Sequence, residues 1–174
     1  ENYPYSHVPH YSLDARVPKV AESTHMFETG HGDCGTQSML FAALCRSLGI
    51  PARTPGGYQM LMAEAPGTHF WAEYYLPGYG WVPNDPTVAE AADWTVIPEE
   101  RQSAFKDYYA ANLDSARLVF QKSVDIPMDP ALPDDVAVFR VVRQFPAVVS
   151  DTADYDLDYF WQGNFTVSLA AVDQ

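Results

Sequence analysis

The sequence is poor in basic residues and in cysteine, and it has no long hydrophobic run. It holds 10 Lys and Arg against 23 Asp and Glu in 174 residues, a formal net charge of −13 at pH 7. Nucleic-acid binding needs clustered positive charge, so no nucleic-acid partner is expected. No apolar run approaches the roughly 18 residues of a transmembrane helix, so no membrane segment is expected in this chain.

The two cysteines also indicate whether a disulfide can form and which cellular compartment is expected. Cys34 and Cys45 would lie about 16 Å apart along one helix, which is too far for a disulfide. A chain without a disulfide framework favours a reducing compartment, so the cytoplasm is the expected location. The chain begins at Glu1 without an initiating Met, which favours a fragment of a longer protein.

Residues 33–51 predict one complete helix. Asp33 is a good N-cap, and Gly49 followed by Pro51 is typical of a helix end. Leucines recur at every fourth position and form an apolar stripe expected to pack against a core: Leu40, Leu44 and Leu48.

Cys34 falls at the first position of this helix. Free backbone N–H groups and the positive end of the helix dipole favour an anion there, such as a thiolate. Such surroundings lower a thiol pKa from about 8.5 to roughly 3.5–7.5, as a nucleophile requires. Placement alone nevertheless favours a buried structural cysteine. Cys45, three turns further into the apolar stripe, is expected to be a small core residue.

Strands are expected after the helix. Residues 69–76 alternate, with Phe70, Ala72, Tyr74 and Leu76 on a core face and His69, Trp71, Glu73 and Tyr75 on a polar face. A turn at residues 77–80 leads to a second short strand that ends at Asp85. A three-residue loop pairs Leu76 with Gly80 and brings Asp85 to the polar face beside His69, and a five-residue loop does the same. A two-residue loop would separate the two side chains.

The remaining chain is expected to alternate between irregular, helical and strand segments. They are an extended arm (1–20), a short helix (21–30), a strand interrupted at 55–57 (52–63), helical pieces beginning at 90 and 98 (87–112), and strands at 117–125, 136–142 and within 155–172. Phe105, Tyr108 and Tyr109 are expected in the core. Acidic residues at 154, 156 and 158 indicate a solvated turn rather than a calcium loop.

A thiol nucleophile needs a base, and the base needs an orienting partner; Cys34, His69 and Asp85 can fill these roles. Four blocks resemble the core of the transglutaminase-like superfamily, of bacterial or archaeal type, in order and spacing. The blocks are 32–35 (GDCG), 48–53 (LGIPAR), 69–73 (HFWAE) and 80–87 (GWVPNDPT). The resemblance covers about residues 30–88.

The resemblance implies an α+β, papain-like fold in which a central helix carrying the cysteine packs on an antiparallel β-sheet or partial barrel. We expect a single domain over residues 1–174, with a core at about 21–127 and a C-terminal β extension at 128–174.

The resemblance also implies acyl transfer from an amide through a thioester, with Cys34, His69 and Asp85 as catalytic residues. The amide would belong to a peptide, an isopeptide or a glutamine side chain, so a peptide or protein is the expected substrate, with no cofactor and no metal. Hydrolysis, as in a protease or amidase, is expected; transfer to an amine, which cross-links proteins, is the alternative.

One departure concerns the oxyanion donor, because relatives use a Trp or Gln upstream of the cysteine and this chain has neither before Cys34. The Cys34 N–H can supply one donor; Gln59 and the N-terminal tyrosines are candidates for the second. Trp71 and Trp81 are candidate walls of a substrate cleft.

The same residues are compatible with two other function classes. A catalytically silent binding module could keep the same three residues. A zinc site could be formed by four nitrogen and sulfur ligands, His25, His31, Cys34 and His69, although the chain has no C-x-x-C pair.

Overall fold

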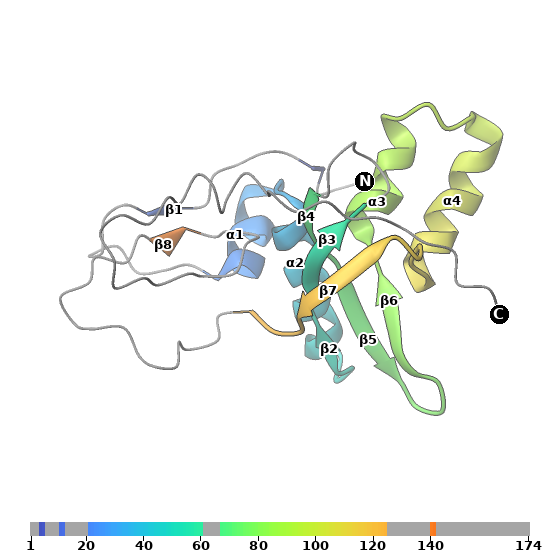
Figure 1. The fold of residues 1–174 in the computed structure, drawn as a ribbon. Helices are drawn as coiled ribbons and strands as arrows, with labels where there is room; N and C mark the ends of the chain where they lie inside the picture. Colours follow the sequence, from blue (N-terminus) through green and yellow to red (C-terminus); the bar gives the residue numbers. More distant parts are fainter. Residues whose placement is uncertain (1–3, 6–10, 13–20, 61–66, 125–139, 142–174) are drawn as a thin grey trace, which may run out of the picture.

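The computed structural model describes residues 4–5, 11–12, 21–60, 67–124 and 140–141 (Figure 1). The helices are α1 (Glu22–Thr29), α2 (Cys34–Ser47), α3 (Pro86–Glu90), the 3₁₀ turn η1 (Ala91–Asp93) and α4 (Glu99–Ala111). The strands are β1 (Tyr11–Ser12), β2 (Ala52–Arg53), β3 (Gly56–Gln59), β4 (Gly67–Phe70), β5 (Ala72–Leu76), β6 (Gly80–Asn84), β7 (Arg117–Gln121) and β8 (Arg140–Val141).

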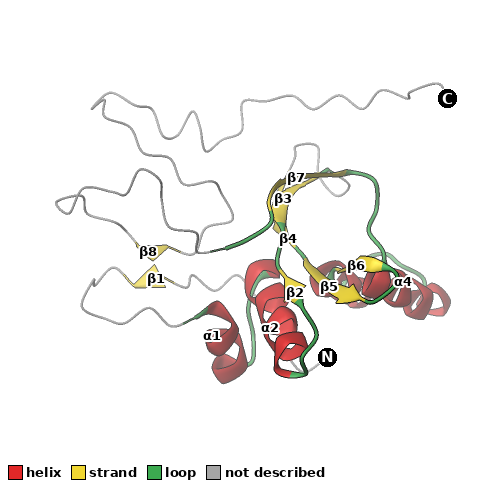
Figure 2. Cartoon of the chain, turned by 90° about the horizontal axis from the view of Figure 1, so that it is seen from below, coloured by secondary structure: helices red, strands yellow, loops and turns green. Residues whose placement is uncertain are grey.

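The strands form antiparallel sheets, ordered β2-β5-β6, β4-β3-β7 and β1-β8. Helix α2 packs against α1, α3, β2, β4 and β5, so the helix that carries Cys34 is central, as expected. Figure 2 shows α1 and α2 side by side, with β2 next to α2. The architecture is α+β with open sheets, and none closes into a barrel within the described residues.

Helix α2 begins and ends where the sequence predicts. The Asp33 carboxylate accepts the Thr36 N–H at 3.0 Å, which caps the first turn. At the other end Gly49 has a φ of +77°, and the Ile50 N–H bonds back to the Cys45 carbonyl at 3.0 Å. That left-handed position favours glycine, and it stops the helix.

The predicted apolar stripe on α2 is wrong in its second half. Leu40 is buried, but Leu44 and Leu48 are 50% and 78% exposed. The fully buried residues of α2 end at Ala42, because the two-residue strand β2 offers little surface to the last turns. Cys45, expected in the core, is only half-buried.

The strand expected at residues 69–76 is two strands in different sheets. Trp71 separates β4 from β5, and its N–H bonds the Pro55 carbonyl at 3.2 Å instead of joining a ladder. β2 and β3 divide at the same level, so the two segments leave one sheet and enter the other together. Phe70 and Ala72 are buried as expected, but His69 and Trp71 of the expected polar face are buried too, and Leu76 of the expected core face is 38% exposed.

Of the loop lengths that the sequence left open, the β5–β6 hairpin has the three-residue one, with Leu76 opposite Gly80. The ladder ends at the Ala72–Asn84 pair, and Asp85 then leaves the sheet as the N-cap of α3. This helix begins at Pro86, four residues before the helical turn expected at residue 90. Proline suits the first helical turn because its missing N–H would have no partner there.

The other predicted elements agree in place more than in burial. α1 and the second helical piece, α4, lie where expected, and β7 is shorter than the strand predicted for 117–125. Of the α4 aromatics expected in the core, Tyr109 is buried, Phe105 is half-buried and Tyr108 is 45% exposed.

Several predictions fall outside the described residues: most of the arm at 1–20, the strands at 136–142 and 155–172 except Arg140–Val141, and the acidic turn at 154–158. The division into a core and a C-terminal extension stays a prediction. No helix in the described part of the chain is long and apolar enough to cross a membrane.

Candidate active site

Cys34 is the first residue of α2 and is 4% exposed. The backbone just before Cys34 is tightly packed. A Cβ on Gly32 would lie 2.1 Å from Thr36 Oγ1 and 2.6 Å from Met26 Sδ. Only glycine lets the segment pass between α1 and the first turn of α2. The backbone just before Cys34 is therefore held close to both helices, with Cys34 at the N-terminus of α2.

His69 links the cysteine to a carboxylate. It lies on β4 opposite Gly57 and is 6% exposed. Its Nε2 lies 2.8 Å from Asp85 Oδ2, and its side chain also hydrogen-bonds Cys34. Since Nε2 faces Asp85, the ring nitrogen left for Cys34 is Nδ1. The Trp71 indole stacks beside the imidazole, with ring centroids 6.3 Å apart.

Asp85 is fully buried and accepts hydrogen bonds on both carboxylate oxygens. Oδ1 accepts the Val88 N–H at 3.0 Å, because Asp85 is also the α3 N-cap. Oδ2 is shared by His69 Nε2 and by Arg117 Nη1, which lies 2.6 Å away. The Asp85 backbone N–H bonds the Tyr109 carbonyl at 2.8 Å, which ties the residue to α4.

His69 and Asp85 each stabilise the charged form of the other. Burial lowers the pKa of His69, but hydrogen bonds with Asp85 and Cys34 and the charges of both outweigh it and raise the pKa to about 9. Burial raises the pKa of Asp85, yet the hydrogen bond and charge of His69 and the charge of Arg117 hold it below its usual value. At neutral pH the pair is an imidazolium and a carboxylate.

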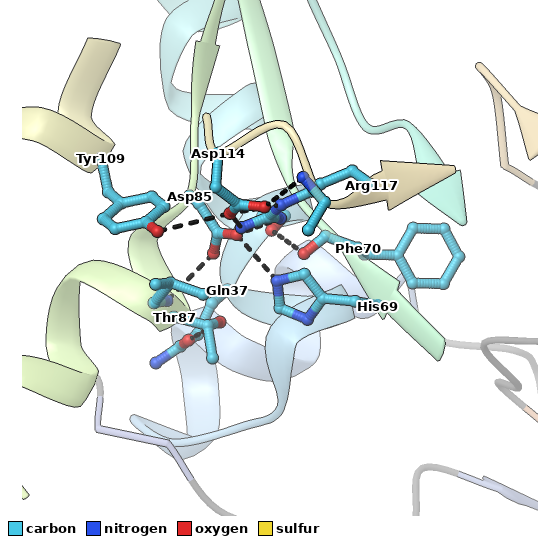
Figure 3. Close-up of polar contacts among 11 residues, drawn as sticks. Gln37, His69, Phe70, Asp85, Thr87, Tyr109, Asp114 and Arg117 are labelled. Carbon is cyan, nitrogen blue, oxygen red and sulfur yellow. Dashed lines mark hydrogen bonds and ion pairs between the residues drawn. The ribbon is translucent and has the colours of Figure 1, made fainter. Parts of the chain in front are cut away.

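Arg117 bridges the carboxylates of Asp85 and Asp114 (Figure 3). Its Nη1 binds Asp85, while its Nη2 and Nε bind Asp114 Oδ2 at 2.8 and 2.9 Å. The Tyr109 hydroxyl donates to the same Asp114 oxygen at 3.3 Å. The guanidinium carbon lies 5.2 Å from the Trp71 ring centroid. β7, α4 and the loop between them thus surround the Asp85 side of the site through Arg117, Tyr109 and Asp114.

A second polar cluster fixes the cysteine helix to the helix that Asp85 caps. Gln37, one turn after Cys34, donates from Nε2 to Glu90 Oε2 at 2.7 Å. Its Oε1 accepts the Thr87 hydroxyl. The Tyr5 backbone N–H also bonds the Glu90 carboxylate, at 3.0 Å from each oxygen. These contacts hold α2 against α3 and so set the spacing of Cys34 and Asp85.

The family model described as transglutaminase-like superfamily matches residues 1–86, which include Cys34, His69 and Asp85. The chain belongs to the transglutaminase-like superfamily.

The individual relatives share about 30% sequence identity with the chain or less. The chain is 31% identical over 114 residues to a protein-glutamine gamma-glutamyltransferase of Pseudomonas aeruginosa, which covers 60% of this chain and 15% of that protein. It is 28% identical over 123 residues to an uncharacterised protein of Haemophilus influenzae, covering 57% and 33%. The chain therefore spans a third or less of the length of these curated relatives.

A solved structure also shows similarity. It is a candidate cysteine protease from Cytophaga hutchinsonii, with 23% identity and a TM-score of 0.39, and it covers 76% of this chain and 44% of that one. That TM-score is too low for the likeness to bear on the site.

The two tryptophans of the expected transglutaminase-like cleft lie in different places. Trp71 is 1% exposed and lies against His69 and Arg117. Trp81 is 41% exposed and packs on Tyr75 and Arg53, with the guanidinium carbon 4.0 Å from its ring centroid. It lies four residues along the chain from Asp85, about 13 Å in an extended strand. The structure brings Trp71, and not Trp81, to the His69–Asp85 pair.

The candidates for a second oxyanion donor also have defined positions. Gln59 lies on β3 opposite Arg117, on the sheet face that carries His69, and its buried Nε2 has no hydrogen-bond partner among the described residues. Tyr5 pairs with Gly32, just before Cys34. Burial, followed by the charges of Cys34 and Asp33, raises the pKa of Tyr5 to about 12, so its phenol keeps its proton.

The zinc alternative has no support from the described residues. His25, His31, Cys34 and His69 all lie within them, and no group of three or more His, Cys, Asp or Glu side chains there could hold a metal ion.

Sequence reasoning missed Arg117, Asp114 and the Gln37 cluster. The family match ends at residue 86, so the transglutaminase-like motifs give no guide to Arg117. The available signal was an arginine beginning a run of apolar strand residues, since a cation at such a position needs a carboxylate partner when it is buried. Gln37 had a comparable signal, an amide among otherwise small or apolar residues one turn after the cysteine.

Proposed function

We propose that this chain is a cysteine-dependent acyl-transfer enzyme that acts on a carboxamide, with Cys34 as nucleophile, His69 as acid and base, and Asp85 as the orienting carboxylate. The observation that carries the proposal is the hydrogen-bonded line from Cys34 through His69 to Asp85, with all three side chains buried. Membership of the transglutaminase-like superfamily supports this general class of chemistry.

In the first half-reaction the Cys34 thiolate attacks the amide carbon, and the carbonyl π electrons move to its oxygen. The Cys34 N–H, at the start of α2, is one donor for that oxyanion. His69 then gives the Nδ1 proton to the leaving nitrogen as the C–N bond breaks. The amine or ammonia departs, and the acyl group remains on Cys34 as a thioester.

In the second half-reaction His69, now neutral, takes a proton from the acceptor as it attacks the thioester. Collapse of the tetrahedral intermediate breaks the C–S bond and restores the thiolate and imidazolium. Asp85 stabilises the imidazolium in both halves through Oδ2, while its Oδ1 accepts the Val88 N–H.

Water is the first candidate acceptor, which makes the reaction hydrolysis of a peptide, isopeptide or glutamine amide. It needs no site beyond the residues above. A primary amine is the second candidate, and two observations favour it. The relative from Pseudomonas aeruginosa is named a protein-glutamine gamma-glutamyltransferase. The formal charge of −13 also attracts cationic amines such as lysine side chains.

The test incubates the protein with a glutamine-containing peptide, with and without a fluorescent primary amine. Ammonia release and amine incorporation are measured in parallel by mass spectrometry. Cys34→Ala is the inactive control, and Cys45→Ala is the matched control that leaves the helix start intact.

Ammonia release without amine incorporation, abolished in Cys34→Ala and kept in Cys45→Ala, identifies a hydrolase. Incorporation of the amine identifies a transferase. A folded protein that consumes neither this peptide nor a panel of peptide and isopeptide amides refutes the enzyme and leaves the silent binding module.

A further inference from the structure

The contact between Arg117 and Asp85 joins the site to a strand outside the matched family region. Arg117 is the first residue of β7, and its side chain is 4% exposed. It reaches Asp85 Oδ2 at 2.6 Å, the same oxygen that receives His69 Nε2. An arginine this buried is costly unless its donors are used, and here Nη1, Nη2 and Nε all bind carboxylate oxygens.

The position of these donors fixes the plane of the Asp85 carboxylate. Val88 holds Oδ1 from α3, and Arg117 holds Oδ2 from β7. With one fixed donor on each oxygen, rotation about the bond to the carboxyl carbon would break both contacts. The direction in which Oδ2 meets His69 is therefore determined by Val88 and Arg117 together. Val88 alone would leave the other oxygen free to swing away from the imidazole.

Asp114 in turn holds the guanidinium in place. It accepts two Arg117 N–H groups, and its other oxygen accepts the Ala116 N–H at 3.1 Å. The guanidinium also lies against Trp71, the ring that stacks on His69. Arg117 is thus fixed on one side by Asp114 and on the other by the residues that surround the imidazole.

We propose that Arg117 is a positioning residue of this site: acting through Asp85, it holds the carboxylate plane that directs His69 Nδ1 toward Cys34. This inference rests on the proposed function, because it gives Arg117 a part in the same reaction. The charge of Arg117 has a second effect, since with His69 it holds the pKa of Asp85 low against the opposing effect of burial.

The test compares Arg117→Met, Arg117→Lys and the wild type, with Arg53→Met as matched control. Arg53 is also a strand arginine paired with a carboxylate, Glu73, at 2.5 Å, but it lies in the other sheet. The first readout is the rate of Cys34 alkylation by iodoacetamide from pH 4 to 10. The second is the His69 Nε2–H signal in ¹⁵N NMR spectra, with its exchange rate.

We expect Arg117→Met to slow Cys34 alkylation about 10- to 100-fold, the range for a misplaced catalytic group. The acid limb of the pH profile should move to higher pH, because Asp85 loses a neighbouring cation. The Nε2–H proton should exchange faster. Arg117→Lys keeps the charge but cannot hold both carboxylates, so it should restore the acid limb and only part of the rate. Arg53→Met should match the wild type in every readout.

A folded Arg117→Met protein with wild-type alkylation and an unchanged acid limb overturns the proposal. If that variant does not fold, Arg117→Lys decides: an intermediate rate supports the positioning role, and a full wild-type rate overturns it. The two proposals fail separately. A wild-type Cys34 no more reactive than Cys45 refutes the proposed function, whereas a reactive wild-type Cys34 with unchanged Nε2–H exchange in Arg117→Met refutes only the role of Arg117.

Discussion

Loss of the His69 proton should make the folded protein less stable as the pH rises. The pKa of His69 in the folded protein is about 9, because its bonds with Asp85 and Cys34 outweigh burial, and an unfolded histidine titrates near 6.5. The folded state therefore binds the proton more tightly. The resulting stability is fully present below pH 6.5 and is lost as the pH rises to about 9. At about 1.4 kcal/mol per tenfold change in proton affinity, the loss is about 3 kcal/mol.

Urea unfolding at pH 6 and pH 9.5, with a thiol reductant, measures this difference. His69→Gln is the control, because glutamine keeps an N–H donor for Asp85 but does not titrate. The wild type should lose about 3 kcal/mol more than His69→Gln between the two pH values. Equal losses in the two proteins, or a wild-type stability that rises with pH, would refute the assigned proton affinity and the ion pair behind it.

Three further substitutions test separate parts of the structure. Cys34→Ala should lower the pKa of His69, measured by NMR titration, because the hydrogen bond and charge of Cys34 help to raise it; an unchanged value would contradict the contact. Gln37→Ala should reduce the free energy of unfolding by about 1–3 kcal/mol, since it removes the partner of the buried Thr87 hydroxyl and one donor to Glu90, and a loss below about 0.5 kcal/mol would contradict that cluster. Gly49→Ala should cost about 1 kcal/mol in urea unfolding, because the residue has a φ of +77°; a gain in stability would be the opposing result.

The local parts of the site could be predicted from the sequence. The Asp33 cap places Cys34 at the start of α2, and residues 77–80 form the expected turn, because capping and turn formation depend on a few neighbouring residues. The length of that turn, which sets Leu76 opposite Gly80, was left open by the sequence. The proximity of His69 and Asp85 was also expected, but the backbone brings Asp85 there in a different way. Asp85 reaches His69 as the cap of α3, after leaving the ladder that was expected to carry it.

Long-range packing could not be predicted in this way. Leu44 and Leu48 fit an apolar stripe, but whether a stripe is covered depends on the length of β2, which periodicity does not give. The break at Trp71 arises from the bond of its N–H to Pro55, a partner sixteen residues away. Arg117 reaches Asp85 from 32 residues further along the chain, so only the folded chain reveals the pairing.

The central claim is that Cys34 and His69 act as a reactive pair, and competitive alkylation tests it most directly. Iodoacetamide is added at pH 7, and the modification rates of Cys34 and Cys45 are read by mass spectrometry in the wild type and in His69→Ala. Cys45 is the internal reference, since it is more exposed than Cys34 and burial raises its pKa. We predict that Cys34 reacts faster than Cys45 despite its burial, and that His69→Ala abolishes the difference. A Cys34 that reacts no faster than Cys45 in the wild type, or equally fast without His69, would contradict the account.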